Sequence, residues 1–197
     1  MPKLWTDTIE SHRETVHGAV LDAAAGLVAA HGLAGITMSA IAEATGIGRA
    51  TLYKYFPDVD AVLAGWHERQ IGRHMAQLAD VAHRPGPPGA RLEAVLNAYV
   101  QNAFGQRARH DAALLHGGEH TRHARRHLQG FLGGLIAEAQ KVGEARGDIA
   151  ADELAIYCLA ALDGAATLTS KAATARLVVL VMATLAPQKK KGSSRRP

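Results

Sequence analysis

Residues 37–57 constrain the fold of this chain most, because their local signals define two short helices and the turn between them. Thr37 is a suitable N-cap, since its hydroxyl can accept a backbone N–H of the first helical turn. Gly46 can adopt the left-handed conformation that ends a helix without a Cβ clash. A second helix is expected from Arg49 to Tyr55. Pro57 ends it, because the residue before a proline is disfavoured in helical geometry.

The order of apolar and polar residues predicts which side of this helix pair is buried. The residues expected in the core are Ile41, Ala44, Ile47, Leu52 and Phe56. The second helix then presents a polar and aromatic face outward, formed by Arg49, Ala50, Thr51, Tyr53, Lys54 and Tyr55. Such a face suits the phosphate oxygens and base edges of DNA. The alternative is a solvated helix whose aromatic residues have no partner.

The segment from Val16 to Leu63 resembles the DNA-binding domain of the TetR family of bacterial transcriptional regulators. The resemblance is carried by Thr37, Ile41-Ala42, Gly46-Ile47 and the run from Thr51 to Phe56. It implies an all-α chain, in which an N-terminal three-helix helix-turn-helix domain is joined by a long helix to a helical ligand-binding and dimerisation domain. It also implies a sequence-specific regulator, a ligand-released repressor rather than an enzyme, and no cofactor.

The same resemblance assigns roles to individual positions. Phosphate contacts are expected from Thr37, Thr51, Tyr53 and Tyr55, and base contacts from Arg49, Ala50 and Lys54. Many relatives carry a phosphate-binding lysine at the start of the next helix, where this chain has Val59 between Asp58 and Asp60. That phosphate contact is therefore not expected from a side chain, although the N–H groups of a helix start can also bind an anion.

The composition of the chain and the positions of its prolines and glycines predict four segments. We expect a flexible arm over residues 1–14, the helix-turn-helix domain over 15–60, a helical ligand-binding and dimerisation domain over 61–186, and a disordered basic tail over 187–197. Individual helices are expected at about 13–30, 58–83, 90–109, 111–116, 119–146, 151–168 and 171–186, with a proline-rich loop over 84–89.

The bulk charge says less about DNA than it first suggests. The chain has 197 residues and a net charge of +4, but Lys189, Lys190, Lys191, Arg195 and Arg196 supply five positive charges in the tail. Without those five charges the total falls to −1, so the DNA-binding prediction depends on the motif.

Other features of the sequence predict a cytoplasmic protein. No secretion signal is apparent, and no run of about eighteen apolar residues predicts a membrane span. The single cysteine, Cys158, lies in an apolar run and is expected to be buried filler in a reducing compartment.

The two C-terminal helices, 151–168 and 171–186, are predicted to form a homodimer. The first is rich in small residues such as Ala160 and Gly164, and the second offers Leu177, Leu180 and other apolar residues to a partner. Two such hairpins around a twofold axis form a four-helix bundle, which allows two recognition helices to contact a pseudo-palindromic operator. The alternative is a helix pair packed within one chain.

The effector pocket implied by the resemblance has no sequence signature of its own. Candidate lining residues are Trp66, Met75, Tyr99, Asn102, Phe104, Phe131 and Tyr157. An alternative function is a metal- or pH-responsive helical protein that uses the histidine-rich segment 110–127, where His120, His123 and His127 share one helical face. Arg122, Arg125 and Arg126 weigh against a bound cation there, and no metal site is predicted.

Overall fold

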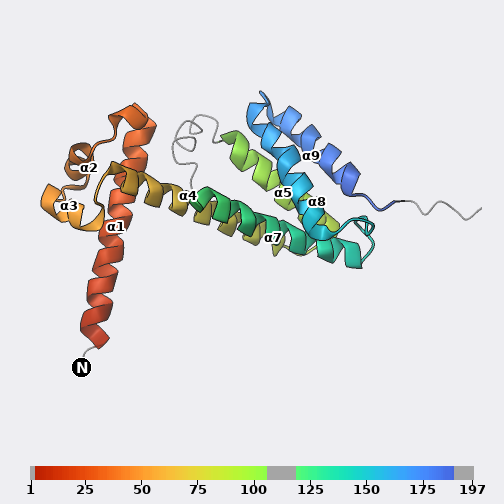
Figure 1. Ribbon diagram of the computed structural model, residues 1–197, viewed down its shortest axis with the longest axis horizontal. Helices are drawn as coiled ribbons and strands as arrows, with labels where there is room; N and C mark the ends of the chain where they lie inside the picture. The colour runs from red at the N-terminus through yellow and green to blue at the C-terminus, as the bar shows by residue number, and fades with distance from the viewer. Residues whose placement is uncertain (1–2, 106–118, 189–197) are drawn as a thin grey trace, which may run out of the picture. The chain divides into compact units, whose positions relative to one another are not determined.

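The computed structural model describes residues 3–105 and 119–188 (Figure 1). All regular structure within those residues is helical, which confirms the predicted all-α fold. The chain divides into two compact units, Met1–Gly72 and Arg73–Pro197, and the division falls within the helix α4, Val59–Ala82. None of the helices described is long and apolar enough to cross a membrane.

The first unit contains α1, Lys3–His31, a 3-10 turn at Leu33–Gly35, α2, Met38–Thr45, α3, Arg49–Tyr55, and the first part of α4. One apolar core holds these helices together. Its buried residues are Val20, Leu21, Ala24, Ile36, Met38, Ile41, Leu52, Phe56, Val62, Leu63 and Trp66. Of the motif residues predicted to be buried, Ala44 is exposed and Ile47 is half-buried.

Helix α1 begins at Lys3, about ten residues before the predicted start, so residues 3–14 are helical rather than an irregular arm. The segment contains neither glycine nor proline after Pro2. Once a helix exists, each added residue contributes a backbone hydrogen bond at little entropic cost, and such a segment can extend it. Residues 11–15 are exposed, which explains why apolar periodicity did not predict this extension.

The second unit contains the last part of α4, then α5, Pro88–Gly105, α7, Glu119–Lys141, α8, Ala151–Asp163, a 3-10 turn at Gly164–Thr167, and α9, Lys171–Leu185. Helix α7 packs on α5 and α8, and α9 packs on α5 and α8 (Figure 1). The shared core includes Leu92, Leu96, Leu132, Ile136, Leu159, Leu162, Val178 and Leu185.

Three helix ends differ from the prediction. Helix α5 begins at Pro88 because proline is tolerated in the first turn, where its missing N–H leaves no bond unmade. Helix α7 ends at Lys141, since Gly143 takes a φ of 76° and turns the chain. Helix α8 ends at Asp163 and tightens into the 3-10 turn before Leu168. Some predictions concern segments that lie outside the described residues. They are the helix at 111–116, with His110 and His116 beside it, and the tail from 189.

Candidate DNA-binding interface

Thr37 caps α2 as predicted. Its backbone is extended, and its Oγ1 accepts a hydrogen bond of 3.0 Å from the Ala40 N–H. The hydroxyl proton is not used in this bond, so an exposed Thr37 can cap the helix and still donate to a phosphate oxygen. One side chain thereby fixes the start of α2 and presents a donor there.

We predict that Thr37→Ala weakens DNA binding and lowers the stability of the first unit. Loss of an N-cap hydroxyl costs about 0.5–2 kcal/mol of folding free energy. Thr37→Ser keeps a hydroxyl at the cap and should recover most of both losses. Thermal unfolding and DNA titration of the two variants provide the measurement, and equal losses for serine and alanine would contradict the proposed role of the hydroxyl.

The turn between α2 and α3 depends on Gly46, whose φ of 70° and ψ of 8° lie in the left-handed region. Most other residues would be strained there. Thr45 supports the turn, because its Oγ1 donates to the Ile41 carbonyl at 2.8 Å and accepts from the Ile47 N–H at 3.3 Å. The angle between the two helices is thus set by local hydrogen bonds as well as by the core.

Helix α3 is anchored by two buried side chains, Leu52 and Phe56. The Phe56 ring also lies beside the His17 ring of α1, with centroids 4.6 Å apart. The chain leaves helical geometry at Phe56, directly before Pro57, as the sequence predicted. This seven-residue helix is therefore held at its centre and at its end by the core of the first unit.

The exposed face of α3 follows from this anchoring. Successive residues turn by about 100° around a helix, so Ala50 and Lys54 lie opposite Leu52, with Thr51 and Tyr53 on either side. All four are exposed, as is Arg49, whereas Tyr55 is half-buried and not fully outward as predicted. Ala50 and Lys54, predicted for base contacts, thus form a central stripe, and Thr51 and Tyr53, predicted for phosphate contacts, lie at its edges.

A clamp from Arg69 of α4 to α1 was not predicted from the sequence. Arg69 Nη2 lies 2.6 Å from Asp22 Oδ1, and Nη1 donates to the Gly18 carbonyl at 3.2 Å. The partners are about 50 residues apart in the chain, and no local pattern links them. The clamp fixes the first part of α4 against α1 within the first unit.

The start of α4 carries an aspartate cap near Val59, the position where many relatives have a phosphate-binding lysine. Asp58 Oδ1 accepts a hydrogen bond of 2.7 Å from the Ala61 N–H and so caps the helix. A carboxylate in this place would repel a phosphate, which agrees with the absence of the usual lysine at Val59.

Comparison with known proteins places these observations in a family. The model of bacterial regulatory proteins of the tetR family matches residues 20–64. The HTH-type transcriptional repressor LfrR of Mycolicibacterium smegmatis (strain ATCC 700084 / mc(2)155) is 33% identical over 91 residues, 46% of this chain and 44% of LfrR. Residues 20–64 therefore resemble the TetR family of bacterial transcriptional regulators, and the stretch matched in LfrR is less than half of that protein.

Solved structures extend the likeness over most of the chain. A TetR/AcrR-family regulator from Thermobifida fusca YX-ER1 has a TM-score of 0.74 and 19% identity, over 92% of this chain and all of that one. The TetR regulator SCO0520 from Streptomyces coelicolor has a TM-score of 0.62 and 27% identity, over 88% and 99%. The predicted fold is thus confirmed over most of the chain, and the predicted resemblance to TetR-family regulators is confirmed over residues 20–64.

The candidate effector-binding residues have different surroundings in the structure. Trp66 is buried in the first unit, and Met75, Tyr99, Asn102 and Phe131 are half-buried in the second. Tyr157 is 45% exposed on α8, and its place in an effector pocket stays a prediction. It lies on the face of α8 away from the buried Cys158 and Leu162. The side chain of Phe104 lies outside the described set.

A polar group joins three helices of the second unit. Asp163, the last residue of α8, accepts hydrogen bonds from Arg125 Nη2 at 2.9 Å and from the Tyr99 hydroxyl at 3.4 Å. Burial, followed by the negative charge of Asp163, raises the pKa of Tyr99 to about 12. Tyr99 therefore stays protonated at neutral pH and keeps its hydrogen on the side of Asp163.

The histidines and the cysteine of the second unit carry no metal or redox site among the described residues. His123 and His127 are exposed on α7, and no group of three potential metal ligands occurs in the described part of the chain. Cys158 is buried, as predicted, and this burial raises the pKa of its thiol to about 11. A thiol with so high a pKa is a poor nucleophile at neutral pH.

Proposed function

We propose that this chain is a TetR-family repressor that binds a pseudo-palindromic operator as a homodimer and leaves it when a small molecule binds. The observation that carries the proposal is the exposed stripe of α3, fixed by Leu52 and Phe56 on the other side of the helix. Its proposed place of action is the cytoplasm, where the operator DNA lies.

Exposed apolar residues on α8 and α9 support the proposed dimer. Ile156 and Tyr157 of α8 are 52% and 45% exposed, and Val179 and Leu180 of α9 are 61% and 64% exposed. The small residues Ala160 and Gly164 are also exposed and follow Ile156 at helical spacing. Each helix thus buries one face in its own protomer and leaves a second apolar face for a partner.

The proposed release by a ligand requires two shapes of the protein that differ in their affinity for DNA. Only a ligand that binds one shape better than the other can shift their populations. Helix α4 belongs to both units. We propose that α4 couples effector binding to the DNA-binding residues. The Arg69 clamp joins α1 to the first part of α4, so α1 would move together with that part.

The test of the regulator proposal uses sheared genomic DNA of the source organism, mixed with purified full-length protein and then sequenced after capture. Enrichment of a few fragments that share an inverted repeat is the expected result. Uniform recovery of fragments from the whole genome, without enrichment of any of them, would contradict a sequence-specific regulator.

Two neighbouring substitutions test the division of roles on α3. Lys54→Ala removes a base-facing side chain and should relax sequence preference, at about 1–3 kcal/mol for the base that it contacts. Tyr53→Phe removes only a hydroxyl at the flank and should weaken binding to all sequences alike. Both are measured by titrating matched and mismatched duplexes. An equal loss of discrimination in the two variants would contradict the division.

A further inference from the structure

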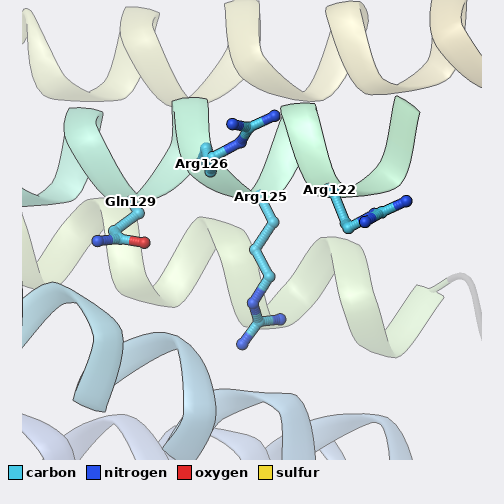
Figure 2. A pocket seen from close by; sticks show the side chains of 4 residues that line it. All are labelled: Arg122, Arg125, Arg126 and Gln129. Atoms are coloured by element: carbon cyan, nitrogen blue, oxygen red, sulfur yellow. The ribbon is translucent and has the colours of Figure 1, made fainter. Parts of the chain in front are cut away.

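The first half of α7 carries a hollow of about 520 Å³ lined by Arg122, Arg125, Arg126 and Gln129 (Figure 2). Cavities of roughly 300–1,000 Å³ are typical of sites for small ligands. All four side chains come from about two helical turns. Arg125 and Gln129 lie seven residues before the buried Leu132 and Ile136, so these two side chains share the helix face that packs into the core further along α7.

Two of the three arginine charges in this hollow are not balanced by any residue that the structure describes. Arg122 and Arg126 are exposed, lie one turn apart and have no ion-pair partner among the described residues. Like charges at this spacing destabilise a helix. Gln129 is neutral and adds both a donor and an acceptor. The hollow thus presents two uncompensated positive charges beside a polar group.

The third arginine of the hollow, Arg125, forms an ion pair with another helix. Arg125 is paired with Asp163 of α8 at 2.9 Å, and the Tyr99 hydroxyl of α5 bonds to the other carboxylate oxygen. A guanidinium has five N–H donors, and this ion pair leaves some of them for a ligand. Figure 2 shows the Arg125 side chain extended away from α7. Its position is therefore fixed by two other helices.

We infer that the hollow binds the phosphate group of a small molecule, and that this phosphate is the charged end of the effector. A phosphomonoester carries about two negative charges at neutral pH, which matches Arg122 and Arg126, whereas a carboxylate carries only one. Guanidinium groups also bind phosphate oxygens in bidentate fashion. The inference rests on the proposed function, because it names the class of effector of the regulator.

Asp163 gives such a ligand a route to the proposed dimer. A phosphate in the hollow competes with Asp163 for Arg125, and Asp163 ends α8. Helix α8 carries Ile156 and Tyr157 of the proposed dimer face. Ligand binding therefore changes the contacts at one end of a dimer helix.

The test is calorimetric titration of the full-length protein with inorganic pyrophosphate at constant ionic strength. The test variant is Arg122→Gln/Arg126→Gln. The matched control is Arg73→Gln/Arg84→Gln, which removes the same charge from exposed positions of the second unit. We expect saturable binding of one pyrophosphate per chain, weakened at least about tenfold in the test variant and less than about twofold in the control. Circular dichroism checks that both variants keep their helix content.

Three results of these titrations would overturn the inference. They are an absence of saturable binding, an equal loss in both variants, and tighter binding of malonate, a dicarboxylate, than of pyrophosphate. A loss of DNA affinity in the test variant without pyrophosphate would assign the hollow to the DNA backbone and also overturn it. Capture of genomic DNA by the unsubstituted protein is scored separately, so failure of the phosphate site is distinguishable from failure of the regulator proposal.

Discussion

Leu180→Glu is expected to convert the proposed dimer to a monomer and to weaken operator binding by about 100-fold or more. Leu180 is 64% exposed in the protomer and lies beside Val179 on the free face of α9. A carboxylate buried in an apolar interface has a high desolvation cost without a partner. A dimer that contacts two linked half-sites typically binds about 10²–10⁴ times more tightly than a monomer that contacts one. A monomeric variant loses this increase in affinity.

Light scattering gives the mass, and a DNA titration gives the affinity. The matched control is Val142→Glu, which places the same charge on another exposed apolar residue, 58% exposed and outside α8 and α9. The control should remain a dimer with unchanged DNA affinity. A dimeric Leu180→Glu variant would contradict the proposed interface.

The second large effect is expected from Leu52→Ala, which removes the central anchor of α3. Leu52 is 0% exposed, and a buried leucine truncated to alanine costs about 2–5 kcal/mol of folding free energy. A small domain has only about 5–15 kcal/mol in total. The variant should therefore unfold its first unit readily and lose DNA binding.

Trp66 is buried in the first unit, so the change of its fluorescence during urea unfolding reports on that unit. Thr51→Ala, the exposed neighbouring position, should change the unfolding free energy by less than about 0.5 kcal/mol. A Leu52→Ala variant as stable as Thr51→Ala would mean that α3 is not held by this side chain.

The part of the fold that depends on local signals was predictable from the sequence. The cap at Thr37, the left-handed Gly46 and the end of α3 before Pro57 each require particular residue types within a few positions. The same holds for Ser170, whose side chain caps α9. The exposed stripe of α3 then follows from the helical period once Leu52 is buried.

Features that depend on distant partners were not predictable. Arg69 pairs with Asp22 and Arg125 pairs with Asp163, and these partners are 47 and 38 residues apart in the sequence. The sequence near either arginine predicts only a solvated side chain. The 45% exposure of Tyr157 was not predictable, because its aromatic character is compatible with a core, a pocket or an interface. The sequence period does not reveal which face of α8 its own protomer covers.

The measurement that tests the central claim most directly is selection of bound sequences from a random DNA pool by the full-length protein at physiological salt. We expect an enriched inverted repeat whose half-sites lie about 34–36 Å apart along the DNA, and a changed half-site sequence for Lys54→Ala. Enrichment of no sequence, with binding that disappears steeply as salt rises, would show contact with phosphates alone and contradict the account.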